Sequence, residues 1–457
     1  MSVRLEELSE CFQGVIPAMI ATCARDGEPN VTYLSQVYYL NPRQVALSCQ
    51  FFNKTRRNVS ENPYATVIVN HPRTMEAYRL VLRFQHLETS GPLFDTMAAR
   101  IQVIASHTGM AGIFRLLSAD VYDVLSLDPL PDFLVAPDPV LDAAAPGEVP
   151  GPLTELRGLQ AVSERVARAG DLECLLGGSL QALDEIFGFD HSMILVPDES
   201  GTLVTIASRG YGDEGIGAEV VVGQGVIGTA AERRRMVRMA GIGSELRYGR
   251  AIRERMSDAG QSHRLAPEIP LPGLADAQAQ LALPLLSGDR LIGVLAVEST
   301  DPLRFDEWDE AFLQIVANQV AAGIDRMQSD DEDGAPALAR LPSQHSGASR
   351  RTFVYYRADE CVFVDGEYLI RNVPGKILWK ILRQRHQGGQ IEFTNRELRL
   401  DPWLGLPSYK DNLESRLILL RKRLQAKCPD VRMVSVRRGR FALELDCAVE
   451  LVEKETS

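Results

Sequence analysis

The stretch from Tyr409 to Leu445 reads YKDNLESRLILLRKRLQAKCPDVRMVSVRRGRFALEL and predicts a helix followed by a β-hairpin. Leucines at helical spacing form one apolar stripe in it: Leu413, Leu417, Leu420 and Leu424. A neighbouring polar stripe is expected to face outward: Asn412, Arg416, Arg423 and Lys427. After the break at Cys428-Pro429-Asp430, two alternating strands flank an arginine-rich turn. A cationic helix followed by a cationic hairpin tip fits a module that reads a DNA groove and touches phosphates.

This stretch resembles the winged-helix effector domain of response-regulator transcription factors. The resemblance rests on Leu420-Arg421-Lys422-Arg423-Leu424 and on Val436-Arg437-Arg438-Gly439-Arg440-Phe441, where Arg440 replaces the second glycine of the family turn. It implies groove contacts through Asn412, Arg416 and Arg423, and phosphate contacts through Arg437, Arg438 and Arg440. A solvated basic helix beside an ordinary hairpin, or a surface that docks another protein, would have the same charge pattern.

The residues before this stretch predict the rest of the same domain. Three short strands are expected within 352–371, and a helix is expected from Pro374 to Arg385. Thr394, followed three residues later by Glu397, predicts a capping box at the start of a short helix. A small sheet, three helices and a hairpin follow the order of the effector family.

The composition indicates several domains and an uneven distribution of charge. A chain of 457 residues is too long for a single core, and its formal net charge is -12. Residues 350–440 hold about 20 basic and about 10 acidic side chains, so this segment is near +10 and the remainder near -22. An acidic body with one basic module indicates that nucleic-acid contact is confined to the C-terminal end.

The cysteines and the apolar runs indicate in which cellular compartment the protein is expected. Seven cysteines occur singly without a CxxC pair, which favours neither a disulfide framework nor a zinc site and fits a reducing environment. The N-terminus has no signal-peptide pattern, and no apolar run approaches about 18 residues. We therefore expect a soluble cytoplasmic protein without a membrane contact.

Two segments rich in Pro, Ala and acidic residues, 129–152 and 329–349, predict linkers. They divide the chain into domains at 1–128, 153–328 and 350–450. The expected fold class is therefore multidomain α+β: a small split barrel, an α/β sandwich and a winged helix.

Within the first domain, the run IPAMIATCARDGEPNVTYLSQVYYLNPRQVALSCQFFNKTRRNVSENPYATVIV resembles the pyridoxamine 5'-phosphate oxidase-like split β-barrel family. Members commonly bind a flavin, and relatives bind deazaflavin or haem. The resemblance implies that Asn53, Lys54, Thr55 and Arg57 hold the phosphate of FMN, with Thr55 where the family usually has Lys. Haem is the weaker expectation, because His71, His86 and His107 have no ligand spacing. No catalytic acid–base pair is recognisable, so the barrel is expected to sense rather than to catalyse.

The second domain resembles a GAF domain, a small-molecule sensor module. The resemblance rests on ASRGYGDEGIGAEVVVGQGVIGTAAERRR, QLALPLLSGDRLIGVLAVES and FDEWDEAFLQIVANQVAAGI. It implies a cavity beside the sheet, with the irregular segment 237–279 as a lid. This segment contains no cysteine for covalent bilin attachment; its His263 is expected to be solvated, and Arg247, Tyr248 and Arg253 could meet an anionic ligand. Asp306 is expected to cap the last helix.

Apolar stripes on the first and last helices of the second domain could pack in a homodimer or cover their own sheet. The stripe on the first helix is Leu156, Leu159, Val162 and Val166. We favour a dimer, because winged-helix regulators gain affinity from paired half-sites.

Together these features predict a ligand- or redox-responsive sensor in signal transduction that binds DNA and regulates transcription. An unknown small molecule is expected in the GAF domain and FMN in the barrel. The alternative is an enzyme, a flavin-dependent oxidoreductase of the pyridoxamine 5'-phosphate oxidase-like type that the GAF domain regulates.

Overall fold

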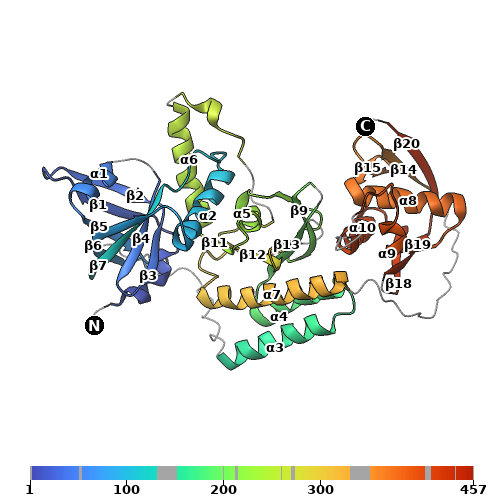
Figure 1. The fold of residues 1–457 in the computed structure, drawn as a ribbon, viewed down its shortest axis with the longest axis horizontal. Helices are drawn as coiled ribbons and strands as arrows, with labels where there is room; N and C mark the ends of the chain where they lie inside the picture. The colour runs from blue at the N-terminus through green and yellow to red at the C-terminus, as the bar shows by residue number, and fades with distance from the viewer. Residues whose placement is uncertain are drawn as a thin grey trace.

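The computed structural model describes residues 3–50, 54–130, 152–198, 200–211, 215–258, 260–268, 273–329, 350–406, 413–437 and 439–455. These residues form three modules that lie in a row: an N-terminal module (3–130), a central module (152–329) and a C-terminal module (350–455) (Figure 1). None of the described helices is long and apolar enough to cross a lipid bilayer.

The N-terminal module is a seven-stranded antiparallel sheet with the order β2-β1-β5-β6-β7-β4-β3. Its elements are η1 (Leu5–Phe12), β1 (Ala18–Cys23), β2 (Pro29–Leu34), β3 (Val37–Asn41), β4 (Gln44–Cys49), α1 (Lys54–Glu61), β5 (Tyr64–Asn70), β6 (Ala77–Glu88), α2 (Pro92–His107) and β7 (Ser118–Leu130). The alternation that predicts the strands places Ile20, Val67 and Leu80 in one apolar core, which η1 covers with Leu5 and Leu8.

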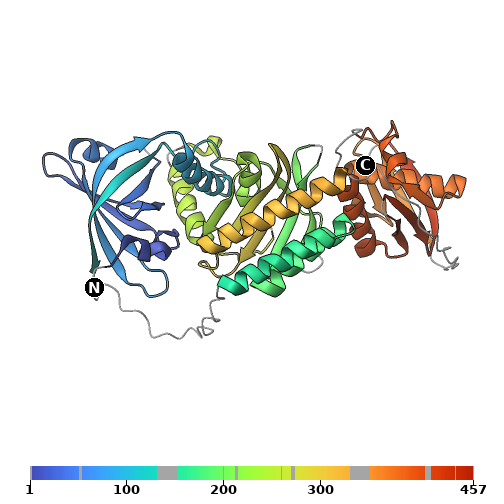
Figure 2. The same cartoon turned by 60° about the horizontal axis from the view of Figure 1, so that its bottom comes forward.

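The central module is a six-stranded antiparallel sheet with the order β10-β9-β8-β13-β12-β11. Its elements are α3 (Pro152–Arg168), α4 (Leu172–Phe187), β8 (His191–Pro197), β9 (Thr202–Arg209), β10 (Glu219–Val221), α5 (Gly225–Arg233), β11 (Val237–Ala240), α6 (Ile242–Asp258), η3 (Ser262–Arg264), β12 (Ala279–Ser287), β13 (Arg290–Ser299) and α7 (Glu307–Ser329). Helices α3, α4 and α7 cover one face of the sheet (Figure 2). The predicted cap of α7 is confirmed, because Asp309 N donates to Asp306 Oδ1 at 2.9 Å.

The segment 237–279 is more regular than predicted. It contains the strand β11, which pairs with β12, and the 17-residue helix α6. The residues that α6 buries against α2 include Ile242 and Leu246. The sequence of this segment gives only a weak helical signal. The helix forms because packing on another module stabilises it.

The N-terminal and central modules share one hydrophobic core. Met97 and Ile101 of α2 pack in the same cluster as Val226 and Ile227 of α5. Helix α2 therefore lies against the face of the central sheet that α3, α4 and α7 leave uncovered. A hydrogen bond between the modules reinforces this packing, since the backbone Gly225 N donates to the side-chain Ser106 Oγ at 2.9 Å.

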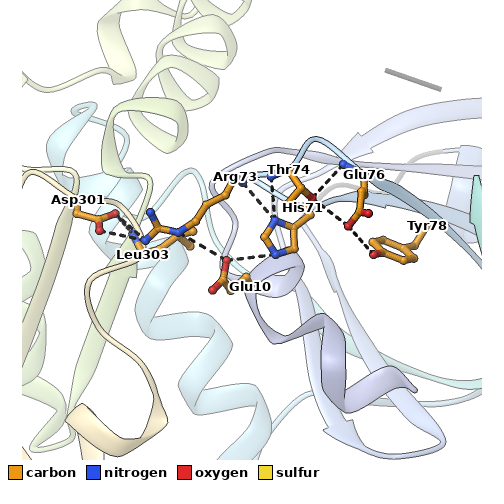
Figure 3. A network of polar contacts seen from close by, with 8 residues as sticks. All are labelled: Glu10, His71, Arg73, Thr74, Glu76, Tyr78, Asp301 and Leu303. Atoms are coloured by element: carbon orange, nitrogen blue, oxygen red, sulfur yellow. Dashed lines mark hydrogen bonds and ion pairs between the residues drawn. The ribbon is translucent and has the colours of Figure 1, made fainter. Parts of the chain in front are cut away.

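A polar network links the same two modules at a second place (Figure 3). Arg73 Nη2 lies 3.0 Å from Asp301 Oδ2 of the central module, and its Nε lies 3.9 Å from Glu10 Oε2. Glu10 Oε2 is also 3.3 Å from His71 Nε2. These contacts and the shared core join the two modules into one packed unit.

The C-terminal module contains two sheets, with the orders β16-β15-β14-β20 and β17-β19-β18. Its elements are β14 (Arg350–Tyr356), β15 (Cys361–Val364), β16 (Glu367–Ile370), α8 (Asn372–Gly388), β17 (Glu392–Thr394), α9 (Asn395–Arg399), α10 (Leu413–Lys427), β18 (Val431–Arg437), β19 (Arg440–Leu445) and β20 (Ala448–Lys454). The strand β20, which was not predicted, pairs in parallel with β14. Helix α8 begins two residues before Pro374, the predicted start.

Local signals in this module are confirmed. Glu397 N donates to Thr394 Oγ1 at 3.2 Å, and Thr394 N donates to Glu397 Oε2 at 3.2 Å, which completes the predicted capping box. The leucine stripe of α10 is buried in a core with Trp379 and Phe441. The hairpin β18–β19 turns where the arginine-rich segment predicts it.

Candidate functional site

A small cavity of about 80 Å³ lies in the N-terminal barrel beside α1. Its polar lining is made of hydroxyls, an amide, one guanidinium and one carboxyl: Thr32, Tyr33, Ser35, Ser48, Gln50, Thr55, Arg56, Asp120, Tyr122 and Tyr248. Thr55 Oγ1 accepts a hydrogen bond from Asn30 Nδ2 at 2.8 Å, which fixes its position at the cavity. A guanidinium with nearby hydroxyls is suited to a phosphate group.

The predicted phosphate-binding residues do not all reach this cavity. Lys54 Nζ turns to Glu28 Oε1, at 2.5 Å, and Arg57 is exposed and does not line the cavity. Asn53 lies outside the described residues. Thr55 lines the cavity, and Arg56 lines it in place of Arg57, because successive residues of a helix point about 100° apart.

A larger groove of about 940 Å³ adjoins the barrel cavity. The two spaces share Thr32, Tyr33 and Tyr248, and the far wall of the groove is α6 of the central module. Arg247 and Arg255 add positive charge to this wall. A group the size of a phosphate fits the small cavity, whereas an aromatic ring system has room only in the groove, beside the two tyrosines.

The residues around these spaces fit a flavin phosphate in kind, with one exception. Asp120 lines the small cavity as a carboxyl group, and burial raises its pKa, although the Ser118 hydroxyl that donates to it at 2.6 Å acts in the opposite direction. Asp120 is the residue of this lining whose negative charge would oppose a phosphate.

A second cavity, of about 350 Å³, lies inside the central module beside strands β8, β9 and β10. Glu298 is buried next to it and accepts hydrogen bonds from Tyr211 Oη at 2.9 Å and from Leu274 N at 2.8 Å. Burial nevertheless raises the pKa of Glu298. Thr205 is fully buried at the cavity wall, and within the described part of the chain its hydroxyl has no hydrogen-bond partner. A ligand with polar groups would satisfy this hydroxyl.

The polar residues of the segment 237–279 have separate roles. Arg247 and Tyr248 line the groove beside the barrel and are not among the residues that line the cavity of the central module. Arg253 instead joins the two modules, since its Nη1 donates to Thr108 O at 2.7 Å. His263 is exposed, in agreement with the expectation of a solvated residue.

The three histidines of the N-terminal module lie at separate places. His86 is exposed beside Glu88, His71 contacts Glu10, and His107 is buried on α2. Across the described ranges, no group of three His, Cys, Asp or Glu side chains is arranged to hold a metal ion.

The polar stripe of α10 faces solvent only in part: Lys427 is exposed, whereas the prediction is corrected for the two arginines. Arg416 and Arg423 are half-buried and line a cavity of about 290 Å³ between the C-terminal and central modules. Arg423 Nη2 donates to Gly217 O at 3.4 Å. The central module covers this face of the helix, and a local pattern cannot show which neighbour lies on a polar stripe.

The hairpin residues also lie close to the central module. Arg437 and Arg440 line a small hollow together with Asp171 and Glu173 at the start of α4. Arg440 Nη1 is 3.1 Å from Glu392 Oε2. Asn412 and Arg438 lie outside the described residues.

Two arginines that the sequence did not single out as contacts complete this interface. Arg421 forms an ion pair with Glu173, and Arg371 forms one with Glu219. The partners are 248 and 152 residues apart in the chain, so no local pattern could have paired them.

Comparison with known families identifies two of the three modules. Residues 5–121 match the family model described as Pyridoxamine 5'-phosphate oxidase, and residues 171–324 match that of the GAF domain. Both domains were predicted from the sequence. Their combination is that of a sensory or regulatory protein. No curated protein matches the chain.

Solved structures resemble the same two parts of the chain. The GAF domain of a phosphoenolpyruvate-protein phosphotransferase from Coxiella burnetii is 23% identical, with a TM-score of 0.32, over 39% of this chain and 96% of that one. Free methionine-R-sulfoxide reductase from Neisseria meningitidis is 23% identical, with a TM-score of 0.29, over 37% and 87%. An FMN-binding protein from Syntrophomonas wolfei is 18% identical, with a TM-score of 0.23, over 27% and 86%.

Proposed function

We propose that the chain is a ligand- or redox-responsive transcriptional regulator, in which the barrel and the GAF domain are inputs and the C-terminal module is a winged-helix output that binds DNA. The observation that carries the proposal is the arrangement of α10 and the hairpin β18–β19. Both pack on one core with α8 and α9, and both present arginines on the same side of the module.

The order and contacts of the C-terminal module support a groove-reading role. Helix α10 is 15 residues long and packs on α8. On one side it carries four buried leucines on successive turns, and on another side it carries arginines. The hairpin follows directly, and β17 extends its sheet by pairing with β19. A helix with one apolar face and one cationic face can be held by its module while it enters a major groove.

The input side of the proposal rests on two spaces of suitable size. The barrel cavity and its groove have cationic and aromatic linings that suit a flavin mononucleotide, with Thr55 and Arg56 at its phosphate. A bound flavin supplies one- or two-electron redox chemistry, which would make the regulator redox-responsive. The GAF cavity, with the buried carboxyl of Glu298 and the hydroxyl of Thr205, suits a small polar molecule.

A DNA-binding experiment tests the output. The full-length protein is titrated against a pool of duplex DNA at several salt concentrations, and bound sequences are selected and identified. The variant Arg416→Ala with Arg423→Ala is expected to lose affinity and to show a smaller dependence on salt. The matched control is Arg357→Ala with Arg383→Ala, which removes the same charge beside Glu453 of β20. Equal binding by the wild type and the Arg416 and Arg423 variant, when α10 is free of the central module, would exclude this assignment of the groove-reading face.

The size of the groove favours a second candidate function, a flavin-dependent oxidoreductase. At about 940 Å³ the groove has room for a ring system and for part of a second small molecule. Reduction of protein-bound flavin by a nicotinamide donor, followed by steady-state turnover with an acceptor, would support the enzyme. Binding of the flavin without turnover would support the sensor.

A further inference from the structure

Helix α10 is docked on the edge of the central module (Figure 1). Ile418 packs in the hydrophobic cluster of the central module, and Arg421 forms an ion pair with Glu173 at the start of α4. Arg423 reaches the carbonyl of Gly217, which has a φ of 79°. This backbone conformation favours glycine, and a side chain here would also displace the Arg423 guanidinium from the carbonyl.

The docked surface is the one that the proposed function assigns to DNA. Arg416 and Arg423 face the cavity between the modules, and Arg437 and Arg440 of the hairpin lie beside the start of α4. A major groove is about 12 Å wide and accepts a helix only when no other protein element lies on the inserted face. The α10 helix therefore cannot enter a groove in this arrangement.

We infer that this docking is an autoinhibitory contact, in which Glu173 and Glu219 of the GAF domain occupy cationic residues that would otherwise meet DNA phosphates. The inference rests on the proposed function. Arg371, which pairs with Glu219, and Arg421, which pairs with Glu173, both belong to the basic C-terminal module. Glu173 and Glu219 on the one hand, and the phosphates of DNA on the other, then compete for the same side of the C-terminal module.

The interface has the character of a contact that can open. Its ion pairs are partly exposed, with side-chain exposures of 28% and 40% for Arg421 and Glu173, and pairs of this kind stabilise an interface only modestly. A cavity of about 290 Å³ remains in the seam, so the two surfaces are not packed to the density of a core.

The short strand β10 connects the GAF cavity with this interface. Ala218 and Val220 line the cavity, whereas Gly217 and Glu219 contact the C-terminal module. Gly217 and Ala218 belong to the turn that precedes β10, and within the strand Glu219 and Val220 point to opposite faces. Within the described sheet, β10 lies at an edge and pairs with β9. A ligand that displaces Ala218 or Val220 would therefore shift the residues that hold α10.

The test uses the full-length variant Glu173→Lys with Glu219→Lys. Hydrogen exchange of residues 413–427 reports on undocking, and fluorescence anisotropy with a mixed-sequence duplex at low salt reports on DNA binding. We expect exchange in α10 and affinity for DNA each to rise by about tenfold or more, because two attractions become repulsions. The control Glu254→Lys with Asp258→Lys makes the same charge change at exposed positions of α6 and should alter neither.

Each outcome separates the inference from the function on which it rests. If the wild type binds DNA as tightly as the Glu173 and Glu219 variant, the contact does not inhibit, although the DNA-binding function stands. If exchange in α10 rises in the variant, but neither the wild type nor the variant binds DNA at any salt concentration, the DNA-binding function is wrong. The inference then falls with it. Should the double substitution unfold the chain, the neutral pair Glu173→Gln with Glu219→Gln tests the same contact. Adding Arg421→Glu to Glu173→Lys should restore protection of α10.

Discussion

The buried ion pair between the N-terminal and central modules predicts a pH-dependent stability. Glu245 of α6 is 4% exposed, and its Oε1 lies 3.8 Å from Nη2 of Arg100 on α2, whose side chain is 12% exposed. Burial raises the pKa of Glu245 to about 7, although the charge of Arg100 acts in the opposite direction. Burial and the nearby charge of Glu245 raise the pKa of Tyr248, one turn further along α6.

The sign and size follow from the difference between the folded and unfolded states. The ordinary pKa of 4.5 is below the value of about 7 in the folded protein, so the folded state holds an extra proton between these pH values. The free energy of unfolding therefore falls as the pH rises from about 4.5 to about 7, by up to about 3 kcal/mol. Below this window the contribution of Glu245 is fully present, and above it the contribution is lost.

The substitution Glu245→Gln removes this titration. Leaving Arg100 buried without its carboxylate also costs stability, but by an amount that changes little with pH. The informative quantity is therefore the difference in unfolding free energy between the variant and the wild type across the pH window, measured by urea unfolding with circular dichroism. We expect the wild type to lose about 3 kcal/mol relative to the variant between pH 4.5 and 7. The control Glu254→Gln changes an exposed carboxyl on the same helix. Parallel pH curves for the wild type and Glu245→Gln would refute the reasoning.

Three further predictions concern the other spaces and surfaces of the molecule. Arg56→Ala should weaken FMN binding by about tenfold or more, since charged hydrogen bonds to a phosphate are lost. The control Arg57→Ala should leave FMN affinity nearly unchanged, as measured by fluorescence titration. Equal losses of affinity in the two variants would contradict the geometry. Thr205→Val replaces a buried hydroxyl that has no hydrogen-bond partner among the described residues, and it should raise the unfolding free energy of the ligand-free protein by about 1 kcal/mol; a loss of stability would indicate an internal water or another partner. Leu156 on α3 and Trp308 on α7 are exposed apolar residues on the helices proposed to form a homodimer. Replacing both with Glu should shift the sedimentation coefficient toward that of a monomer. An unchanged sedimentation coefficient would exclude this pair of helices as the dimer interface.

Local patterns in the sequence determined many of the elements and their ends. The leucine spacing of α10, the capping box at Thr394 and the N-cap at Asp306 each involve residues no more than a few positions apart, and the structure confirms all three. The GAF and barrel domains were also recognisable, because their motifs lie in continuous runs.

The tertiary structure decided what covers each face. Helix α6 forms where the sequence predicted an irregular lid, because α2 of another module buries its apolar residues. The position of Arg56 rather than Arg57 at the barrel cavity depends on how α1 is set against the strands. Arg416 and Arg423 of α10 were predicted to face solvent, yet the GAF domain covers them, and the partner of Arg423 lies 206 residues away in the chain. Periodicity records which side of an element is apolar or charged, whereas the identity of its neighbour depends on contacts between distant parts of the chain.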